Sequence, residues 1–129
     1  MNQPGGVPSI SAREASAAAA SPDPHGPLIV DVRERDEFAA TRIAGVALVP
    51  MSELPARYRE LPSDRPLLLI CHVGGRSSMA TQFLRQQGWP DVTNIDGGMV
   101  AWMRDGLPVR TGTPEPGEGD LPGAEAPER

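Results

Sequence analysis

The one cysteine of this chain stands where a nucleophile could be built. Cys71 follows the aliphatic run 67–70, and a short loop with Gly74 and Gly75 leads from it into a helical pattern. A buried strand, a tight loop and a helix start in this order direct loop amides and the positive end of a helix at the cysteine sulfur. Lone cysteines are often inert and buried, but these surroundings favour a thiolate. We therefore predict that Cys71 is a reactive nucleophile.

The residues after Cys71 form the rest of the predicted site. Gly74 and Gly75 let the loop turn with its amides inward, because glycine adopts positive φ angles without a steric penalty. Arg76 offers five N–H donors in a rigid fork, which suits a bound oxyanion. It equally fits a surface arginine in the first turn of a helix, and both interpretations remain open at this point.

Two further loop residues have more than one interpretation. Ser77 is able to hydrogen-bond a loop carbonyl or the sulfur, or to cap the helix, and we favour the cap. His72 is interpreted as loop lining, because adjacency in sequence does not bring two side chains together. The predicted site thus has Cys71 as its catalytic residue and a binding loop of six residues: His72, Val73, Gly74, Gly75, Arg76 and Ser77. No metal or other cofactor is expected, since one cysteine and two distant histidines do not match metal-ligand spacing.

Strands and helices alternate on both sides of this loop. Strands are expected at 9–10, 28–32, 67–70 and 92–95, with a further strand within 44–49. Helices are expected at 11–20, 34–40, 76–87 and 99–105, and 52–61 is expected to be a helix-like segment that Pro55 interrupts early. Ser11 and Glu14 have the spacing of a capping box at the first helix. The alternation predicts an α/β fold with a parallel sheet between helices. Ligands bind beyond the carboxyl ends of strands in such sheets, which is where Cys71 and segment 31–33 fall.

Several residues near the predicted site are assigned structural roles. Arg33 is expected to pair with a carboxylate such as Glu37 and to hold the loop after its strand. Phe38 and Trp102 are interpreted as core residues, because large aromatic side chains in helical patterns are most often buried. His25 lies in a Pro-rich loop, where the sequence suggests no partner for it.

Composition divides the chain of 129 residues into one domain and two ends. Pro and Gly, which number 15 and 14, concentrate at the ends. We expect a disordered lead over 1–8, a domain over 9–110 and a disordered tail over 111–129. The tail carries five acidic residues and one arginine, which leaves the body near neutral within a net charge of −5. Removing the tail is therefore expected to change stability and turnover little.

The same composition argues against several classes of function. There is no basic stripe with interleaved aromatic residues, so we expect no nucleic-acid partner. No apolar run approaches the roughly 18 residues of a membrane span, and the polar first eight residues do not resemble a signal peptide. A single cysteine forbids an intrachain disulfide, which fits a reducing compartment. We expect a cytoplasmic protein that has no contact with a membrane.

In its motifs and their order, the chain resembles the rhodanese-like domain family of sulfurtransferases over residues 9–110. The resemblance rests on segments 28–34, 37–38, 42–46, 49–50, 71–77, 97–102 and 106–109. It implies a three-layer α/β/α rhodanese-like fold with a five-stranded parallel sheet, and a cysteine that carries a persulfide. Two positions depart from the family pattern, since Arg42 stands where a histidine is frequent and Val46 where an alanine is frequent.

The resemblance implies a sulfurtransferase that works through a Cys71 persulfide. It would move a sulfane sulfur from a small-molecule donor such as thiosulfate to a thiol or cyanide acceptor, and a protein persulfide is a further class of partner. Two alternatives remain. A dual-specificity phosphatase or arsenate reductase also uses a loop cysteine, but such phosphatases have five residues between cysteine and arginine, where Cys71 and Arg76 enclose four. A non-catalytic binding module is the other alternative, although inactive rhodanese domains commonly lack the cysteine.

Overall fold

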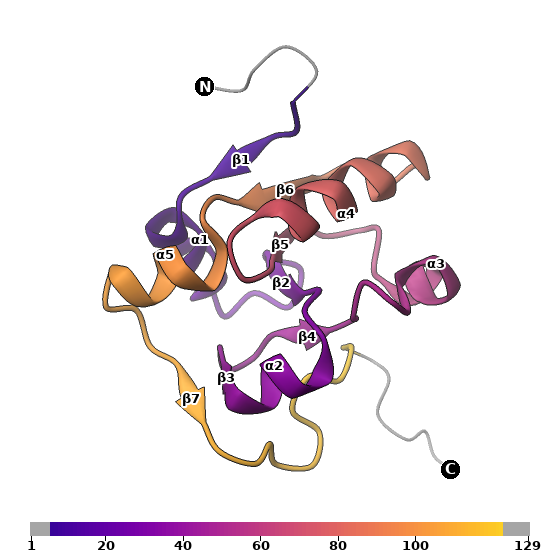
Figure 1. Cartoon of the computed structure of the whole chain (residues 1–129). Coiled ribbons are helices and arrows are strands. Elements are labelled where there is room, and N and C mark those ends of the chain that lie inside the picture. The colour runs from indigo at the N-terminus through magenta and orange to yellow at the C-terminus, as the bar shows by residue number, and fades with distance from the viewer. Residues whose placement is uncertain (1–5, 123–129) are drawn as a thin grey trace.

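A five-stranded parallel sheet lies at the centre of the molecule (Figure 1), and the computed structural model describes residues 6–122. In spatial order its strands are β1 (Ser9–Ile10), β6 (Val92–Ile95), β5 (Leu67–Ile70), β2 (Leu28–Asp31) and β4 (Ala47–Leu48). The central strands β2 and β5 run in register from Leu28 beside Leu67 to Asp31 beside Ile70. The segments that follow these two strands therefore leave the sheet at the same edge.

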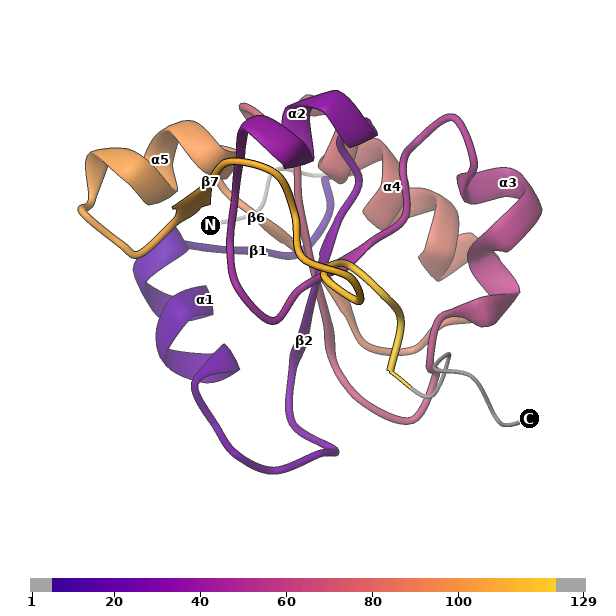
Figure 2. The same cartoon turned by 90° about the horizontal axis from the view of Figure 1, so that it is seen from below.

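Helices cover both faces of this sheet (Figure 2). One face packs against α3 (Leu54–Arg57) and α4 (Gly75–Gln86), and the other against α1 (Ala12–Ala19), α2 (Arg35–Ala40) and α5 (Gly98–Arg104). Alternate residues of each central strand contribute to the two cores, as Leu67 and Leu69 do on one side and Leu68 and Ile70 on the other. Burial on both faces explains why these strands are continuous aliphatic runs.

The predicted three-layer fold with a five-stranded parallel sheet is confirmed. The capping box of Ser11 and Glu14 is present at α1, and Phe38 and Trp102 are both buried. The strand expected within 44–49 is β4, which begins after the chain turns at Gly45, whose φ is +81°. The helix-like segment expected over 52–61 consists of α3 and a 3-10 turn, Tyr58–Glu60, and Pro55 lies in the first turn of α3, where a proline does not interrupt a helix.

The predicted disordered tail differs from the structure over residues 111–122, while 123–129 lie outside the described residues. Strand β7 (Arg110–Thr111) pairs antiparallel with β3 (Thr41–Arg42) in a small second sheet. Further on, the Leu48 amide donates to the Gly119 carbonyl at 2.7 Å along the edge of β4. Leu121 then enters the core beside α3 and is only 5% exposed. The tail thus covers the edge strand of the main sheet (Figure 1).

A buried ion pair fastens this segment to the domain. The Arg42 side chain is 1% exposed, and its guanidinium donates to both carboxylate oxygens of Glu118 at 2.9 and 3.1 Å. It also donates to the Gly112 carbonyl at 2.6 Å. Paired and hydrogen-bonded charges are tolerated in an interior where lone ones are not. The arginine that departs from the family pattern therefore anchors the tail.

The predicted disordered lead lies mostly outside the described residues, which begin at Gly6. Within the described part, the Pro8 carbonyl accepts from the Asn94 amide at 2.8 Å, so the last residue of the lead already follows the sheet edge. None of the helices within residues 6–122 is long and apolar enough to cross a membrane.

Candidate active site

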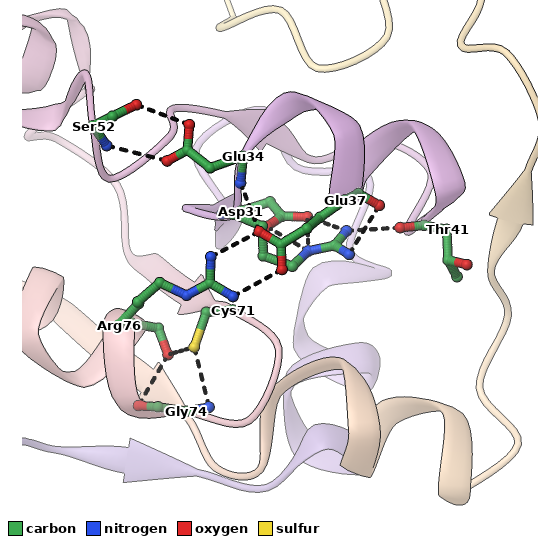
Figure 3. Close-up of polar contacts among 10 residues, drawn as sticks. Asp31, Glu34, Glu37, Thr41, Ser52, Cys71, Gly74 and Arg76 are labelled. Carbon is green, nitrogen blue, oxygen red and sulfur yellow. Dashed lines mark hydrogen bonds and ion pairs between the residues drawn. The ribbon is translucent and has the colours of Figure 1, made fainter.

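Cys71 lies directly after β5, at the carboxyl edge of the sheet, and it is 1% exposed. The Gly74 amide donates to its Sγ at 3.1 Å (Figure 3). The Ser77 hydroxyl lies 3.3 Å from the same sulfur. Helix α4 begins at Gly75, so its N-terminus and unpaired amides lie next to the cysteine loop. The Gly74 amide and the N-terminus of α4 stabilise negative charge at Sγ, which is the arrangement that the sequence predicts.

The turn between β5 and α4 depends on a left-handed residue. Gly74 has a φ of +111° and caps the helix, while the Ser78 amide donates back to its carbonyl at 3.0 Å. A side chain at this φ would be strained, which accounts for a glycine there. Gly75 already lies in the helix and has open space around it. Of the two glycines expected to shape the loop, Gly74 is the one whose backbone conformation forms the turn.

The start of α5 supports the cysteine loop from the other side. The Met99 amide donates to the Cys71 carbonyl at 2.8 Å, and the Val100 amide donates to the His72 carbonyl at 3.1 Å. This approach requires Gly98, whose φ is +56°. A Cβ there would lie 2.4 Å from the Cys71 carbonyl oxygen and 2.6 Å from that of His72. Two glycine-rich turns therefore fit together to hold the nucleophile.

The contact between these turns gives a test of the loop. Gly98→Ala places a methyl group against backbone that has no room to yield, so we expect a loss of about 2 kcal/mol or more in the free energy of unfolding. The rate at which iodoacetamide alkylates Cys71 should also change. Gly75→Ala is the matched control, because nothing lies within 4 Å of its added Cβ. Equal stability of the two variants, measured by urea unfolding, would contradict the close packing described for Gly98.

Arg76 is held by a carboxylate at the mouth of the site. Its guanidinium donates to both oxygens of Glu37 on α2, at 2.7 and 2.9 Å (Figure 3). The side chains are 37% and 32% exposed, so the pair is partly screened by solvent. The hydrogen bonds from Arg76 lower the pKa of Glu37 from 4.5 to about 2. The stabilisation from this pair is therefore fully present above the unfolded pKa of 4.5 and is lost as the pH falls toward 2.

The partner expected for Arg33 was wrong in part. Its guanidinium binds the Asp31 carboxylate, with Nη2 and Oδ2 2.7 Å apart, and both side chains are buried. It reaches Glu37 only through the backbone carbonyl, at 3.2 Å, and it also donates to the Thr41 carbonyl. The Glu37 carboxylate is left for Arg76. Arg33 does hold the segment after its strand, as expected, since it links β2 to the end of α2.

Ser77 is not the helix cap that the sequence favours. Gly74 caps α4, and Ser77 is the third residue of the helix, in its first turn, with no exposed surface. Its hydroxyl contacts Cys71 Sγ and lies 2.6 Å from Oδ1 of Asn94 on β6. Sequence analysis missed Asn94, which is 5% exposed. The available signal in the sequence was a polar residue next to the apolar Ile95 in a strand of four residues.

The remaining residues of the predicted loop are exposed. His72 and Val73 point away from the core, and Val73 is 62% exposed. His72 lines a hollow of about 250 Å³ together with residues of α2, of α5 and of the chain on either side of α2, namely Glu37, Ala40, Met99, Met103, Arg33 and Thr41. The structure thus brings Cys71, Gly74, Arg76 and Ser77 together. It places His72 and Val73 on the rim.

A cysteine after a central parallel strand, with its sulfur facing a short loop at a helix start, defines a class of α/β proteins with a nucleophile at the sheet edge. The model of the Rhodanese-like domain matches residues 11–105, and the chain belongs to this family. A sulfurtransferase of Allochromatium vinosum is 42% identical over 82 residues, which cover 64% of this chain and 77% of that protein.

Solved structures agree with this assignment. A rhodanese-related protein of Thermoplasma volcanium superimposes with a TM-score of 0.73 at 31% identity, covering 80% of this chain and 97% of that one. A thiosulfate sulfurtransferase of Pseudomonas aeruginosa gives a TM-score of 0.69 at 26% identity, covering 82% of this chain and 20% of that one. The chain thus matches only one fifth of that longer protein. Together with the Allochromatium relative, these likenesses support sulfur transfer as the general activity.

Proposed function

We propose that the protein transfers sulfane sulfur through a persulfide on Cys71. The Cys71 thiolate attacks the outer sulfur of a donor such as thiosulfate, the sulfur–sulfur bond of the donor breaks, and sulfite leaves with its electron pair. The product is Cys71–S–S⁻. An acceptor thiolate or cyanide then attacks the outer sulfur, which restores the Cys71 thiolate. No external oxidant or reductant is required, because in each step one nucleophile replaces another on the same sulfane sulfur atom.

The main support for this proposal is the position of Cys71 Sγ, which lies next to the Gly74 amide and the N-terminus of α4. Both groups favour an anionic sulfur, and each step of the cycle leaves one. Cys71 is also the one cysteine of the chain, so no second thiol is available to attack the persulfide from within. The acceptor must therefore be an outside molecule, either a small thiol, cyanide or a thiol on another protein.

The ion pair of Arg76 argues against the phosphatase alternative. A phosphate needs donors for three outer oxygens, whereas the loop between Cys71 and Arg76 has four residues and one amide directed at Sγ. The Arg76 donors that would face an oxyanion are bound by the Glu37 carboxylate instead. This arrangement supports a site for a single added sulfur atom. Cys71 is present, and its sulfur contacts the Gly74 amide and the Ser77 hydroxyl. This supports a catalytic domain over a non-catalytic binding module.

Two measurements test the proposal. Intact mass spectrometry after incubation with thiosulfate should show the mass of one added sulfur atom, and a thiol reductant should remove it. Transfer of sulfur from thiosulfate to cyanide should be measurable, with no significant hydrolysis of p-nitrophenyl phosphate. Phosphatase activity without sulfur loading would overturn the assignment.

Arg76 gives a prediction about donor preference. Glu37→Gln removes the carboxylate that occupies the guanidinium, so Arg76 becomes free to bind the sulfonate end of thiosulfate. We expect the Michaelis constant for thiosulfate to fall by about threefold or more, as one charge-assisted hydrogen bond is gained. Arg76→Ala should raise the same constant. Loading by an uncharged donor should change in neither variant, and equal effects on both donors would return Arg76 to a structural role.

A further inference from the structure

Two buried polar side chains, Ser77 and Asn94, connect the nucleophile to strand β6. Asn94 projects from β6, its Oδ1 lies 2.6 Å from the Ser77 hydroxyl oxygen, and that oxygen lies 3.3 Å from Cys71 Sγ. Asn94 is 5% exposed, and Cys71 and Ser77 are more buried still. Buried polar groups with defined partners fix each other's orientation. Asn94 therefore touches the reacting sulfur only through Ser77.

The Ser77 hydroxyl has three polar neighbours, since the Gly74 carbonyl oxygen lies 3.4 Å away in addition to Cys71 Sγ and Asn94 Oδ1. It cannot donate its proton to all of them at once. It has one proton to donate and two lone pairs that accept. A separation of 2.6 Å is normal for O–H···O and short for N–H···O, so the serine proton points at the Asn94 oxygen. A lone pair of Ser77 then faces Cys71 Sγ. This orientation accepts a hydrogen bond from a neutral thiol, but it opposes a charged sulfur.

A charged sulfur requires the opposite orientation. The Ser77 hydroxyl must then donate to Sγ, and its lone pairs face Asn94. The carboxamide meets this change by a half turn that presents Nδ2 in place of Oδ1, since the two ends of an asparagine amide have nearly the same shape. Among the hydrogen bonds formed within residues 6–122, none engages Nδ2 of Asn94, so nothing described there opposes the turn.

We propose that Asn94 is a positioning residue whose amide turns with the charge of Cys71 and thereby sets the direction of the Ser77 hydroxyl. It accepts from Ser77 while the sulfur is a thiol, and it donates to Ser77 while the sulfur is an anion. The inference deepens the proposed function and rests on it, because that function requires an anionic sulfur. Asparagine suits this place, whereas an aspartate could only accept and a leucine could do neither.

A double-mutant cycle tests the coupling. In Asn94→Asp the carboxylate keeps the Ser77 proton, so alkylation of Cys71 by iodoacetamide at pH 7 should slow by about tenfold, and its pH profile should move to higher pH. Ser77→Ala removes the hydroxyl through which Asn94 acts. In that background Asn94→Asp should change the rate by less than about twofold. Equal slowing in both backgrounds would show a direct effect of the added charge and would overturn the proposal.

A second measurement does not depend on whether Asn94→Asp folds. In the wild type, the NMR signals of the Asn94 side-chain amide should move over the pH range in which the ultraviolet absorbance of the Cys71 thiolate appears. In Ser77→Ala this movement should largely disappear, and its persistence would contradict the proposal. Neither measurement needs a sulfur donor. A protein that shows the coupling but forms no persulfide would therefore refute the proposed function alone.

Discussion

Cys71→Ser should fold like the wild type and lose sulfur transfer. The substitution keeps a small side chain that still accepts from the Gly74 amide, so we expect a melting temperature close to that of the wild type. A serine hydroxyl is not ionised near neutral pH and forms no persulfide. Turnover of thiosulfate and cyanide should thus fall by about a thousandfold or more, as for removal of a catalytic nucleophile.

His72→Ala is the matched control for this result. His72 is the neighbour of Cys71 in sequence, but it lies on the rim of the site and its side chain is exposed. Turnover in this variant should stay within about tenfold of the wild type, because general acid–base catalysis would contribute more than that. Substantial thiocyanate formation by Cys71→Ser would rule out Cys71 as the nucleophile. A much larger loss in His72→Ala would instead give the histidine a catalytic role.

The sheet and the cysteine loop could be predicted because their signals are local. Aliphatic runs of four residues mark strands that are buried on both faces, and glycines mark the turns that end them. The bounds of β5 follow directly from such a run. The position of Cys71 after a buried strand then places it at the carboxyl edge of a parallel sheet. Each of these steps depends only on residues close together in the chain.

The partners of charged and polar residues could not be predicted in the same way. Arg33 and Arg76 both lie within reach of Glu37, and sequence spacing favours the nearer arginine, four residues away. The structure gives the carboxylate to Arg76, 39 residues away, because Asp31 already binds Arg33 in the interior. Asn94 was missed for a related reason. Its contact with Ser77 joins β6 to α4, and nothing in the strand pattern identifies which helix residue it meets.

The tail shows where an argument from average composition fails. Residues 111–129 are rich in Pro, Gly and acid, which is typical of segments that bury too little surface to offset their ordering. Within 111–122, however, a few contacts decide the outcome. Leu121 fills a place in the core, and Glu118 neutralises a buried arginine. The average composition of the segment does not show that one leucine reaches the core and that one glutamate meets a buried arginine.

Truncation after Arg110 should therefore destabilise the domain, contrary to the expectation from composition. It exposes the apolar surface that Leu121 covers, which amounts to about 2 kcal/mol for a leucine side chain. It also leaves Arg42, which is 1% exposed, without the Glu118 carboxylate. Together these losses should lower the melting temperature by roughly 10 °C, since each kcal/mol corresponds to several degrees in a domain of this size.

Two controls locate the cause of this loss. A chain that ends at Pro122 keeps every contact described for the tail, so its melting temperature should equal that of the full chain. Glu118→Gln should destabilise the domain, whereas Glu115→Gln, on the same segment but exposed, should not. An unchanged melting temperature after truncation at Arg110 would contradict the packing of the tail. Because the tail covers β4 and not the Cys71 loop, the truncated domain should retain its rate of persulfide formation at temperatures where it stays folded.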